Sequence, residues 1–312
     1  MMIDDMESVT AKLCSFVRAY HSNYEKDLIF DDYLAYDLMG REEYEEVGQL
    51  IEHDYHKELY DPAYSFSGRK IRDILDRYIA PIPLSRGAFT ERELVRFAWQ
   101  FGKCQYVICG AGMDTFAFRN TNPDIEIFEI DHPDTQRYKL EKIKHLEWII
   151  PKNVHYVAVD FGKDDMREEL KKAGFDSKTP SYFAIPGVTY YLTLPVFEET
   201  LHKIADIAAF GSKLAFDFPD DTTLGDSAPE RVRTLSDITA FLGEPMLHGY
   251  SVKEVNDALE RQGFIADMHE TPAKIQQRFF GERSDGKRAF ENIHFVLAKI
   301  GNRDTESYYL YI

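Results

Sequence analysis

Apolar residues recur with two different spacings along the chain, and the change between them comes near residue 100. Before it the spacing is helical, whereas from residue 105 onward short apolar runs alternate with amphipathic stretches. Seven apolar runs predict strands, at 105–109, 125–130, 154–159, 181–185, 213–218, 264–269 and 293–299. The last two lack a clear helix between them. The pattern predicts an α/β fold with a mostly parallel seven-stranded sheet, one antiparallel strand and flanking helices.

Proline, glycine and capping residues mark several helix ends in this second part. Pro133 begins the helix after the second strand, because proline is favoured at the first helical position. Ser251 and Glu254 form a predicted capping box that opens a helix over 252–262. Between the fifth strand and that helix, a polar stretch and a helix of roughly 230–242 are predicted to form a lid insertion at about 219–250.

The first hundred residues are predicted to be a helical cap section, with helices over 7–20, 41–59 and 68–79. Pro81 and Pro83 are expected to close the last of these helices. No repeat or low-complexity linker separates this section from the predicted core at 101–300. We therefore expect one domain over 1–312.

Composition and charge narrow the classes of function. The net charge is −17, and residues 1–61 alone hold 16 acidic and 5 basic residues. Nucleic-acid binding is disfavoured, because phosphate contacts need a basic face. The apolar runs are too short to span a membrane, and the acidic start does not resemble a secretion signal, so we expect a cytoplasmic protein. The three cysteines predict neither a disulfide framework nor a zinc site.

The first predicted strand runs into Gly110-Ala111-Gly112, and Asp131 ends the second strand about twenty residues later. In a Rossmann-like fold this spacing places a carboxylate beside the ribose of a nucleotide-like cofactor. Glycines there let the backbone approach the ligand with no Cβ in the way.

Asp114 and Thr115 help to distinguish between two cofactors. A dinucleotide site needs a third glycine near Thr115, and its pyrophosphate needs a positive helix N-terminus. Asp114, expected in the first turn of the next helix, would repel a pyrophosphate but not the ammonium and sulfonium groups of S-adenosylmethionine. We interpret the site as one for S-adenosylmethionine, with a nicotinamide dinucleotide as the alternative.

Four motifs occur in order along the chain: GAGMDTFAFR, FEIDHPDTQRYK, VAVDF and GVTYYLT. Together they resemble the leucine carboxyl methyltransferase family, which also includes O-methyltransferases of polyketide biosynthesis, and the resemblance covers about residues 25–220. It implies a class I methyltransferase sheet, S-adenosylmethionine as the methyl donor, and an oxygen atom, often of a carboxylate, as the acceptor.

The resemblance also implies donor-binding residues. In the segment SRGAF, Arg86 matches the arginine that binds the methionine carboxylate; a surface arginine near a helix start is the alternative. Gly110-Ala111-Gly112 matches the turn that lines the methionine moiety. Asp131 matches the ribose-binding acid, and Glu129, on the same strand face, is an alternative for that role.

For the adenine, Asp160-Phe161 matches a pair in which the acid accepts from the exocyclic amine and the aromatic ring covers the base. The alternative is that Asp160 caps the next helix. Pro186 departs from the family, whose members usually carry an acid there that lines the donor pocket. This departure leaves open that the chain binds the donor but has lost or altered its catalysis.

No residue identifies itself as a catalytic base. Tyr190 and Tyr191 are weak catalytic candidates, and each is more typical of a packed aromatic; His132 is expected to cap the helix at Pro133. An acidic cluster after the fifth strand, Asp217, Asp220 and Asp221, lacks matching acids elsewhere, and we expect no metal. We predict an S-adenosylmethionine-dependent O-methyltransferase acting on a carboxylate or hydroxyl of a small molecule or peptide terminus. A donor-binding protein with altered catalysis and an NAD(P)-dependent oxidoreductase are the alternatives.

Overall fold

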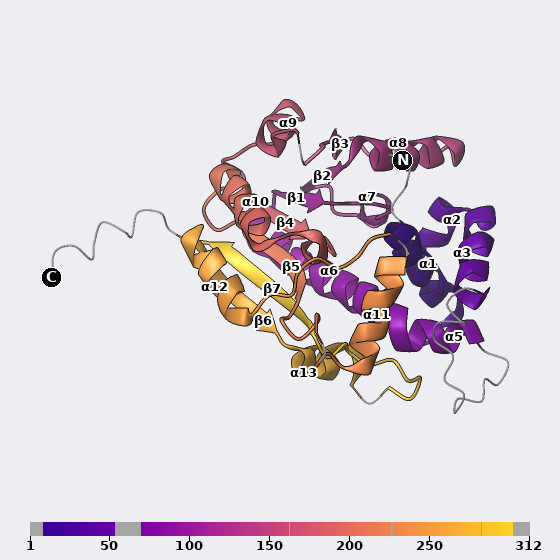
Figure 1. Cartoon of the computed structure of the whole chain (residues 1–312). Helices are drawn as coiled ribbons and strands as arrows, with labels where there is room; N and C mark the ends of the chain where they lie inside the picture. Colours follow the sequence, from indigo (N-terminus) through magenta and orange to yellow (C-terminus); the bar gives the residue numbers. More distant parts are fainter. Residues whose placement is uncertain are drawn as a thin grey trace.

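The computed structural model describes residues 9–53, 70–161, 163–225, 227–241, 243–281 and 283–301. Its centre is a seven-stranded sheet with the order β3-β2-β1-β4-β5-β7-β6. The strands are β1 (Cys104–Cys109), β2 (Ile125–Asp131), β3 (Val154–Ala158), β4 (Ser181–Ile185), β5 (Lys213–Pro219), β6 (Phe264–Glu270) and β7 (Ile293–Ile300). Strand β7 runs antiparallel to both of its neighbours, and the other pairs are parallel. The predicted sheet, with one reversed strand, is confirmed (Figure 1).

Apolar layers cover both faces of the sheet, because successive residues of a strand point to opposite sides. In β1, Tyr106 and Ile108 pack in the cluster that contains α6 (Pro81–Phe101), α11 (Glu230–Phe241) and α13 (Pro272–Ile275). Val107 and Cys109 pack on the other face, against α9 (Met166–Lys172), α10 (Leu194–Ile207) and α12 (Val252–Arg261). Each fully buried large apolar side chain stabilises the fold by about 1.5–3 kcal/mol.

The N-terminal helices form a third apolar cluster beside the sheet. They are α1 (Val9–Tyr24), α2 (Ala35–Met39), α3 (Arg41–His53) and α5 (Lys70–Ile74), and α5 continues into a π-helical turn, η1 (Leu75–Ile79). The predicted helix 41–59 is confirmed over Arg41–His53, and positions 54–59 lie outside the described residues. In this cluster Leu13 and Phe16 of α1 meet Leu84 of α6 and Ile238 of α11. Figure 1 shows α11 beside α1, although the two are far apart in the sequence.

One helix was missed by the sequence analysis. Pro81 and Pro83 do not only end the preceding helix; they lie in the first turn of α6, a 21-residue helix that runs to Phe101. Proline fits there because the first N–H groups of a helix have no partner within the helix. As a result, Arg86 lies in the second turn of a long helix whose first turn is buried, instead of a short connecting segment.

Two further α-helices follow β1 and β2 in the chain. They are α7 (Phe116–Arg119), which follows the glycine turn, and α8 (Pro133–His145), which follows β2. Ser251 and Glu254 form the predicted capping box of α12. Among the described residues, no helix is both long enough and apolar enough to cross a bilayer.

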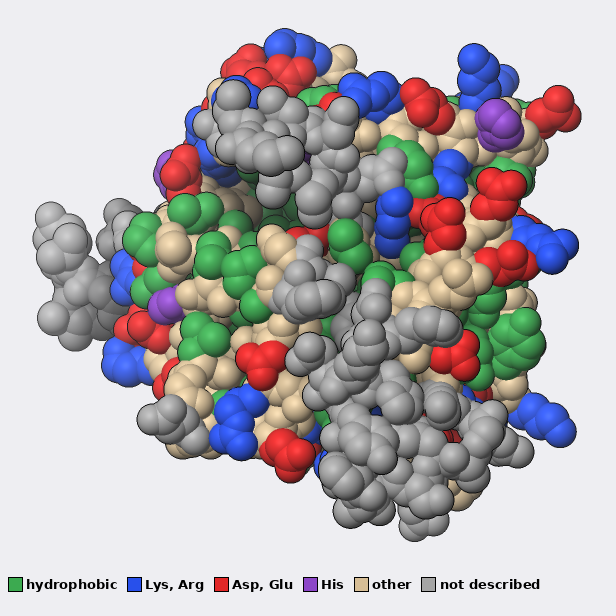
Figure 2. All heavy atoms as spheres, turned by 45° about the vertical axis from the view of Figure 1, so that its right-hand side comes forward, with side chains coloured by type: hydrophobic (Ala, Val, Ile, Leu, Met, Phe, Trp, Pro, Cys, Tyr) green, Lys and Arg blue, Asp and Glu red, His purple; other side chains and the backbone are tan. Residues whose placement is uncertain are grey.

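The surface is mixed in charge despite the net charge of −17. On the face shown in Figure 2, acidic and basic side chains are interspersed, and the described basic side chains there form no continuous area. Many are paired, as Arg41 is with Glu45 on α3, and exposed pairs of this kind contribute only about 0.2–1 kcal/mol.

Candidate functional site

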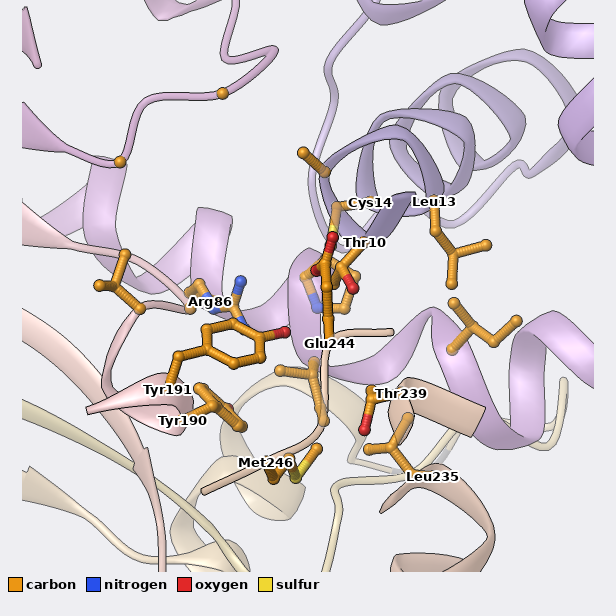
Figure 3. Close-up of a pocket in the computed structure, with 18 of the residues that line it drawn as sticks. Thr10, Leu13, Cys14, Arg86, Tyr190, Tyr191, Leu235, Thr239, Glu244 and Met246 are labelled. Atoms are coloured by element: carbon orange, nitrogen blue, oxygen red, sulfur yellow. The ribbon is translucent and has the colours of Figure 1, made fainter. Parts of the chain in front are cut away.

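A cavity of about 280 Å³ lies at the carboxyl edge of β1 and β2, beneath α1 and α11. Figure 3 shows side chains of α1 and α11 around it, together with Arg86, Tyr190 and Tyr191. Its lining is Thr10, Ala11, Leu13, Cys14, Ile79, Ile82, Pro83, Arg86, Gly110, Gly112, Asp131, Thr135, Gly187, Val188, Tyr190, Tyr191, Leu235, Ile238, Thr239, Glu244 and Met246. In a mostly parallel sheet, this edge is where ligands bind.

The glycine turn after β1 forms the floor of the cavity. Gly110 and Gly112 have φ values of +77° and +50°, which residues other than glycine rarely adopt. A Cβ on Gly110 would lie 2.7 Å from Val188 Cγ2, which is too close for two carbon atoms. The turn therefore requires glycine at position 110 both for its backbone conformation and for the narrow space in front of it.

Asp131 closes the same turn from the end of β2. Its Oδ2 accepts from Gly112 N–H at 2.5 Å and its Oδ1 from His132 N–H at 2.7 Å. Burial raises the pKa of Asp131 above its usual value, although the two N–H groups oppose that shift. The carboxylate is thereby held in one orientation at the wall of the cavity, with oxygen lone pairs available to a ligand.

Glu129, the alternative to Asp131 for the ribose-binding role, is paired with a lysine in the protein interior. It is 1% exposed, and Lys139 Nζ of α8 donates to its Oε2 at 2.5 Å. Glu129 does not line the cavity, so Asp131 is the acid of β2 that faces it.

Arg86 reaches the cavity from α6. Its Nε donates to Asp217 Oδ2 of β5 at 2.8 Å, and the guanidinium lies so close to Gly187 that a Cβ there would overlap it. Burial alone would lower the pKa of Arg86, but the Asp217 carboxylate raises it well above the usual range. Its side chain is only 16% exposed, so the surface-arginine alternative is wrong.

Asp217 also organises the segment after β4. Besides Arg86, the carboxylate accepts from Gly187 N–H at 2.8 Å and from the Tyr190 hydroxyl at 2.7 Å. In the sequence, Asp217 stands out only as one of three acids after an apolar strand, with Asp220 and Asp221. Its two oxygens are instead used by three protein donors, one of them on α6, 131 positions away.

The two catalytic candidates after β4 differ in their surroundings. Tyr190 is 4% exposed and its hydroxyl is bonded to Asp217, which is a structural arrangement. Tyr191 points its hydroxyl into the cavity (Figure 3). Burial raises the pKa of Tyr191 to about 12, so its hydroxyl stays protonated at neutral pH.

A second cavity of about 110 Å³ adjoins the first, and both are lined by Arg86, Gly110 and Gly112. Asp114 and Pro186 also line it. Asp114 was expected in the first turn of α7, but it lies before the helix. Its Oδ1 accepts from Phe116 N–H at 2.6 Å. Its carboxylate therefore occupies one of the N-terminal donors that a pyrophosphate would need, and its charge would repel that group.

Asp160 and Phe161 lie after β3 and are not among the lining residues of either cavity. Asp160 Oδ2 is 2.6 Å from Lys163 Nζ and 3.9 Å from His132 Nε2, and Phe161 is 48% exposed. The alternative that Asp160 caps the next helix is wrong, because Asp165 caps α9. His132 accepts from Asp134 N–H at the start of α8 and is the expected cap.

Sequence reasoning missed two segments that contribute residues to the cavity. Thr10 and Cys14 come from α1, and Glu244 and Met246 follow α11. For α1 the only signal was an amphipathic helix, which does not indicate what the helix covers. The predicted lid at about 219–250 contains Glu244, but nothing in its sequence marked that residue.

The lining fits S-adenosylmethionine. A cationic guanidinium, a glycine turn with no room for a Cβ at position 110 and a fixed carboxylate line one cavity, and this set is chemically complementary to a molecule that carries a carboxylate and a ribose. Together with the strand order and the reversed β7, these features define a class I S-adenosylmethionine-dependent methyltransferase.

Comparisons with known proteins agree. The profile of the leucine carboxyl methyltransferase family matches residues 11–205. The putative S-adenosyl-L-methionine-dependent methyltransferase YktD of Bacillus subtilis is 32% identical over 301 residues, which cover 93% of this chain and 97% of YktD. A putative methyltransferase of the same description from Mycobacterium marinum is 30% identical over 212 residues, 65% of this chain and 69% of that protein.

Among solved structures, a DUF574 family protein from Streptomyces avermitilis aligns with a TM-score of 0.53 and 15% identity over 78% of this chain and 95% of its own. At that identity the likeness concerns the fold. The sequence matches establish more: the chain belongs to the leucine carboxyl methyltransferase family and is an S-adenosylmethionine-dependent enzyme. The predicted family and cofactor are confirmed, and the dinucleotide alternative is set aside.

Proposed function

We propose that this enzyme is an O-methyltransferase that acts on a carboxylate or hydroxyl of a small molecule or peptide terminus. The observation that carries the proposal is the meeting of Arg86, Gly110, Gly112 and Asp131 at one cavity that continues into an apolar chamber. The first part fits the donor, and the second leaves room for an acceptor beside it.

On the donor side, the Arg86 guanidinium binds the methionine carboxylate with the N–H groups that Asp217 does not use. Asp131 accepts from the ribose hydroxyls, and charged hydrogen bonds of this kind contribute roughly 1.5–3 kcal/mol each. Asp114 lies in the smaller cavity, where the acid normally found at Pro186 is missing, and faces the donor ammonium. Asp160 and Phe161 receive the adenine at the open edge of the site.

When bound, S-adenosylmethionine would supply a methyl group to an oxygen nucleophile, and its sulfur would leave as the neutral thioether of S-adenosylhomocysteine. The protein's contribution is to hold the acceptor in line and to exclude water, and positioning of this kind accounts for much of the acceleration in such reactions. The lining helices α1 and α11 cover the cavity and support that role.

Isothermal titration with S-adenosylmethionine, S-adenosylhomocysteine and NADH tests the donor assignment. We expect micromolar affinity for the first two and no heat with NADH. Methyl transfer is then followed by mass spectrometry on a panel of carboxylic acids, phenols, alcohols and a peptide with a C-terminal leucine. Nitrogen or carbon methylation in place of oxygen methylation would overturn the proposal.

Pro186 supports one rival, a protein that binds the donor with altered catalysis. Proline offers no side-chain acceptor at a position that lines the smaller cavity. Micromolar donor affinity without turnover on any oxygen acceptor of the panel would favour this rival. Recovery of turnover in Pro186→Glu would then identify the missing acid as the cause.

A further inference from the structure

Part of the lining of the cavity that holds Arg86 and Asp131 is apolar. Side chains from α1, η1, α6, α11 and the segment after α11 form it: Leu13, Ile79, Ile82, Leu235, Ile238 and Met246. None of these six side chains can form a strong hydrogen bond with a polar group of an acceptor. An acceptor that fills this chamber must therefore present an apolar skeleton to it.

Glu244 brings a carboxylate into this apolar chamber. It follows α11, where its N–H donates to the Thr239 carbonyl at 2.9 Å. Figure 3 shows its side chain extending from that segment toward Thr10 and Cys14 of α1, near the Tyr191 hydroxyl. Burial is the main cause of the raised pKa of Tyr191; a hydrogen bond with Thr10 opposes it, and the nearby charge of Glu244 adds a smaller upward contribution, which agrees with the proximity of Glu244 and Tyr191.

The cavity offers a positive charge to the donor but a negative charge to the acceptor. Among the described lining residues, Arg86 is the one cation, and its Nε already serves Asp217. Under the function proposed above, its other N–H groups serve the donor carboxylate. An anionic acceptor would then have no cation and would face the like charge of Glu244 in a poorly hydrated site.

Resting on that proposed function, we propose that Glu244 selects the acceptor: it admits an apolar molecule bearing a neutral hydroxyl and disfavours a carboxylate. The hydroxyl donates a hydrogen bond to the Glu244 carboxylate. As the oxygen–methyl bond forms, the hydroxyl proton passes to Glu244 and on to water, and the electron pair of the broken methyl–sulfur bond stays on sulfur. Tyr191 keeps its proton and orients the acceptor oxygen.

Two probes of one shape, 4-butylphenol and 4-butylbenzoate, test this selection. Their affinities for the full chain are measured by isothermal titration at neutral pH with S-adenosylhomocysteine present. We expect the phenol to bind at least about tenfold more tightly than the benzoate. In Glu244→Gln the benzoate should gain affinity until the ratio falls below about threefold. Glu260→Gln removes the same charge from the exposed face of α12 and should leave the ratio unchanged.

S-adenosylhomocysteine affinity, measured first without either probe, separates the two proposals. If it is absent, the proposed function fails. If S-adenosylhomocysteine binds and its affinity is unchanged in Glu244→Gln, the proposed function stands and only the role of Glu244 is tested. Three results would overturn that role: the wild-type chain binds both probes equally, it binds neither, or the ratio is unaltered in the variant.

Discussion

Arg86 Nε donates to Asp217 Oδ2 at 2.8 Å, across 131 positions of sequence. The same carboxylate accepts from Gly187 N–H and the Tyr190 hydroxyl, so α6, β5 and the turn after β4 meet at one buried acid. A guanidinium held by one edge presents its remaining N–H groups in a fixed direction. Asp217 is thus a positioning residue for the arginine that we propose binds the donor.

Asp217→Asn tests this role. The amide keeps the size of the side chain but removes the charge opposite Arg86. We expect donor affinity to fall about tenfold and the free energy of unfolding to fall by roughly 2–4 kcal/mol, because a buried charge is left without its partner. Calorimetric titration and urea unfolding measure the two effects. Asp221→Asn, at an exposed position just after the end of β5, is the control and should change neither. Unaltered donor affinity in Asp217→Asn would argue against the positioning role.

Gly110→Ala should disrupt the floor of the cavity. The new Cβ would lie 2.7 Å from Val188 Cγ2, and φ is +77°. We expect a loss of roughly 1–3 kcal/mol in stability and at least tenfold weaker donor binding. In Gly112→Ala the Cβ meets Ala11 Cβ at an ordinary 3.6 Å, so the stability loss should be smaller. Adding Val188→Ala to Gly110→Ala should recover part of the stability; if it recovers none, the contact with Val188 is not the cause.

Donor affinity should depend on pH through Asp131. Burial raises the pKa of this carboxyl, and only the ionised form accepts from both ribose hydroxyls. Affinity should therefore be full well above the raised pKa and should fall as pH decreases through it, at a higher pH than for an ordinary aspartate. Titrations with S-adenosylhomocysteine between pH 4 and 8 measure the profile, with circular dichroism to verify the fold. Asp131→Asn should bind weakly at every pH, and a wild-type-like profile in this variant would exclude Asp131 as the group responsible.

The buried pair of Glu129 and Lys139 should affect stability, not binding. Each is 1% exposed. Lys139→Met leaves the acid buried without a partner, and we expect a loss of about 3–5 kcal/mol. The double variant Glu129→Gln, Lys139→Met should regain most of it and bind the donor within about twofold of wild type. A large loss of donor affinity in a folded double variant would instead return Glu129 to the ribose site.

The strands, most helices and the glycine turn were predictable because each depends on residues close together in the chain. The apolar run of β1, the glycines after it and Asp131 at the end of β2 lie within 104–131, and parallel pairing of two neighbouring strands brings them together. The motifs that identify the family are equally local. The prediction that Pro81 and Pro83 only end a helix was incomplete, because proline can end one helix and also begin the next.

The partners of side chains from distant segments could not be obtained in this way. Local spacing shows that α1 has an apolar face but not that Thr10 and Cys14 of this helix line the cavity. It marks Asp217 as an acid after an apolar strand but does not reveal Arg86 beside it. These contacts depend on the strand order and on how α1, α6 and α11 pack over the sheet. That packing is set by the summed burial of many apolar residues, and no short stretch of sequence encodes it.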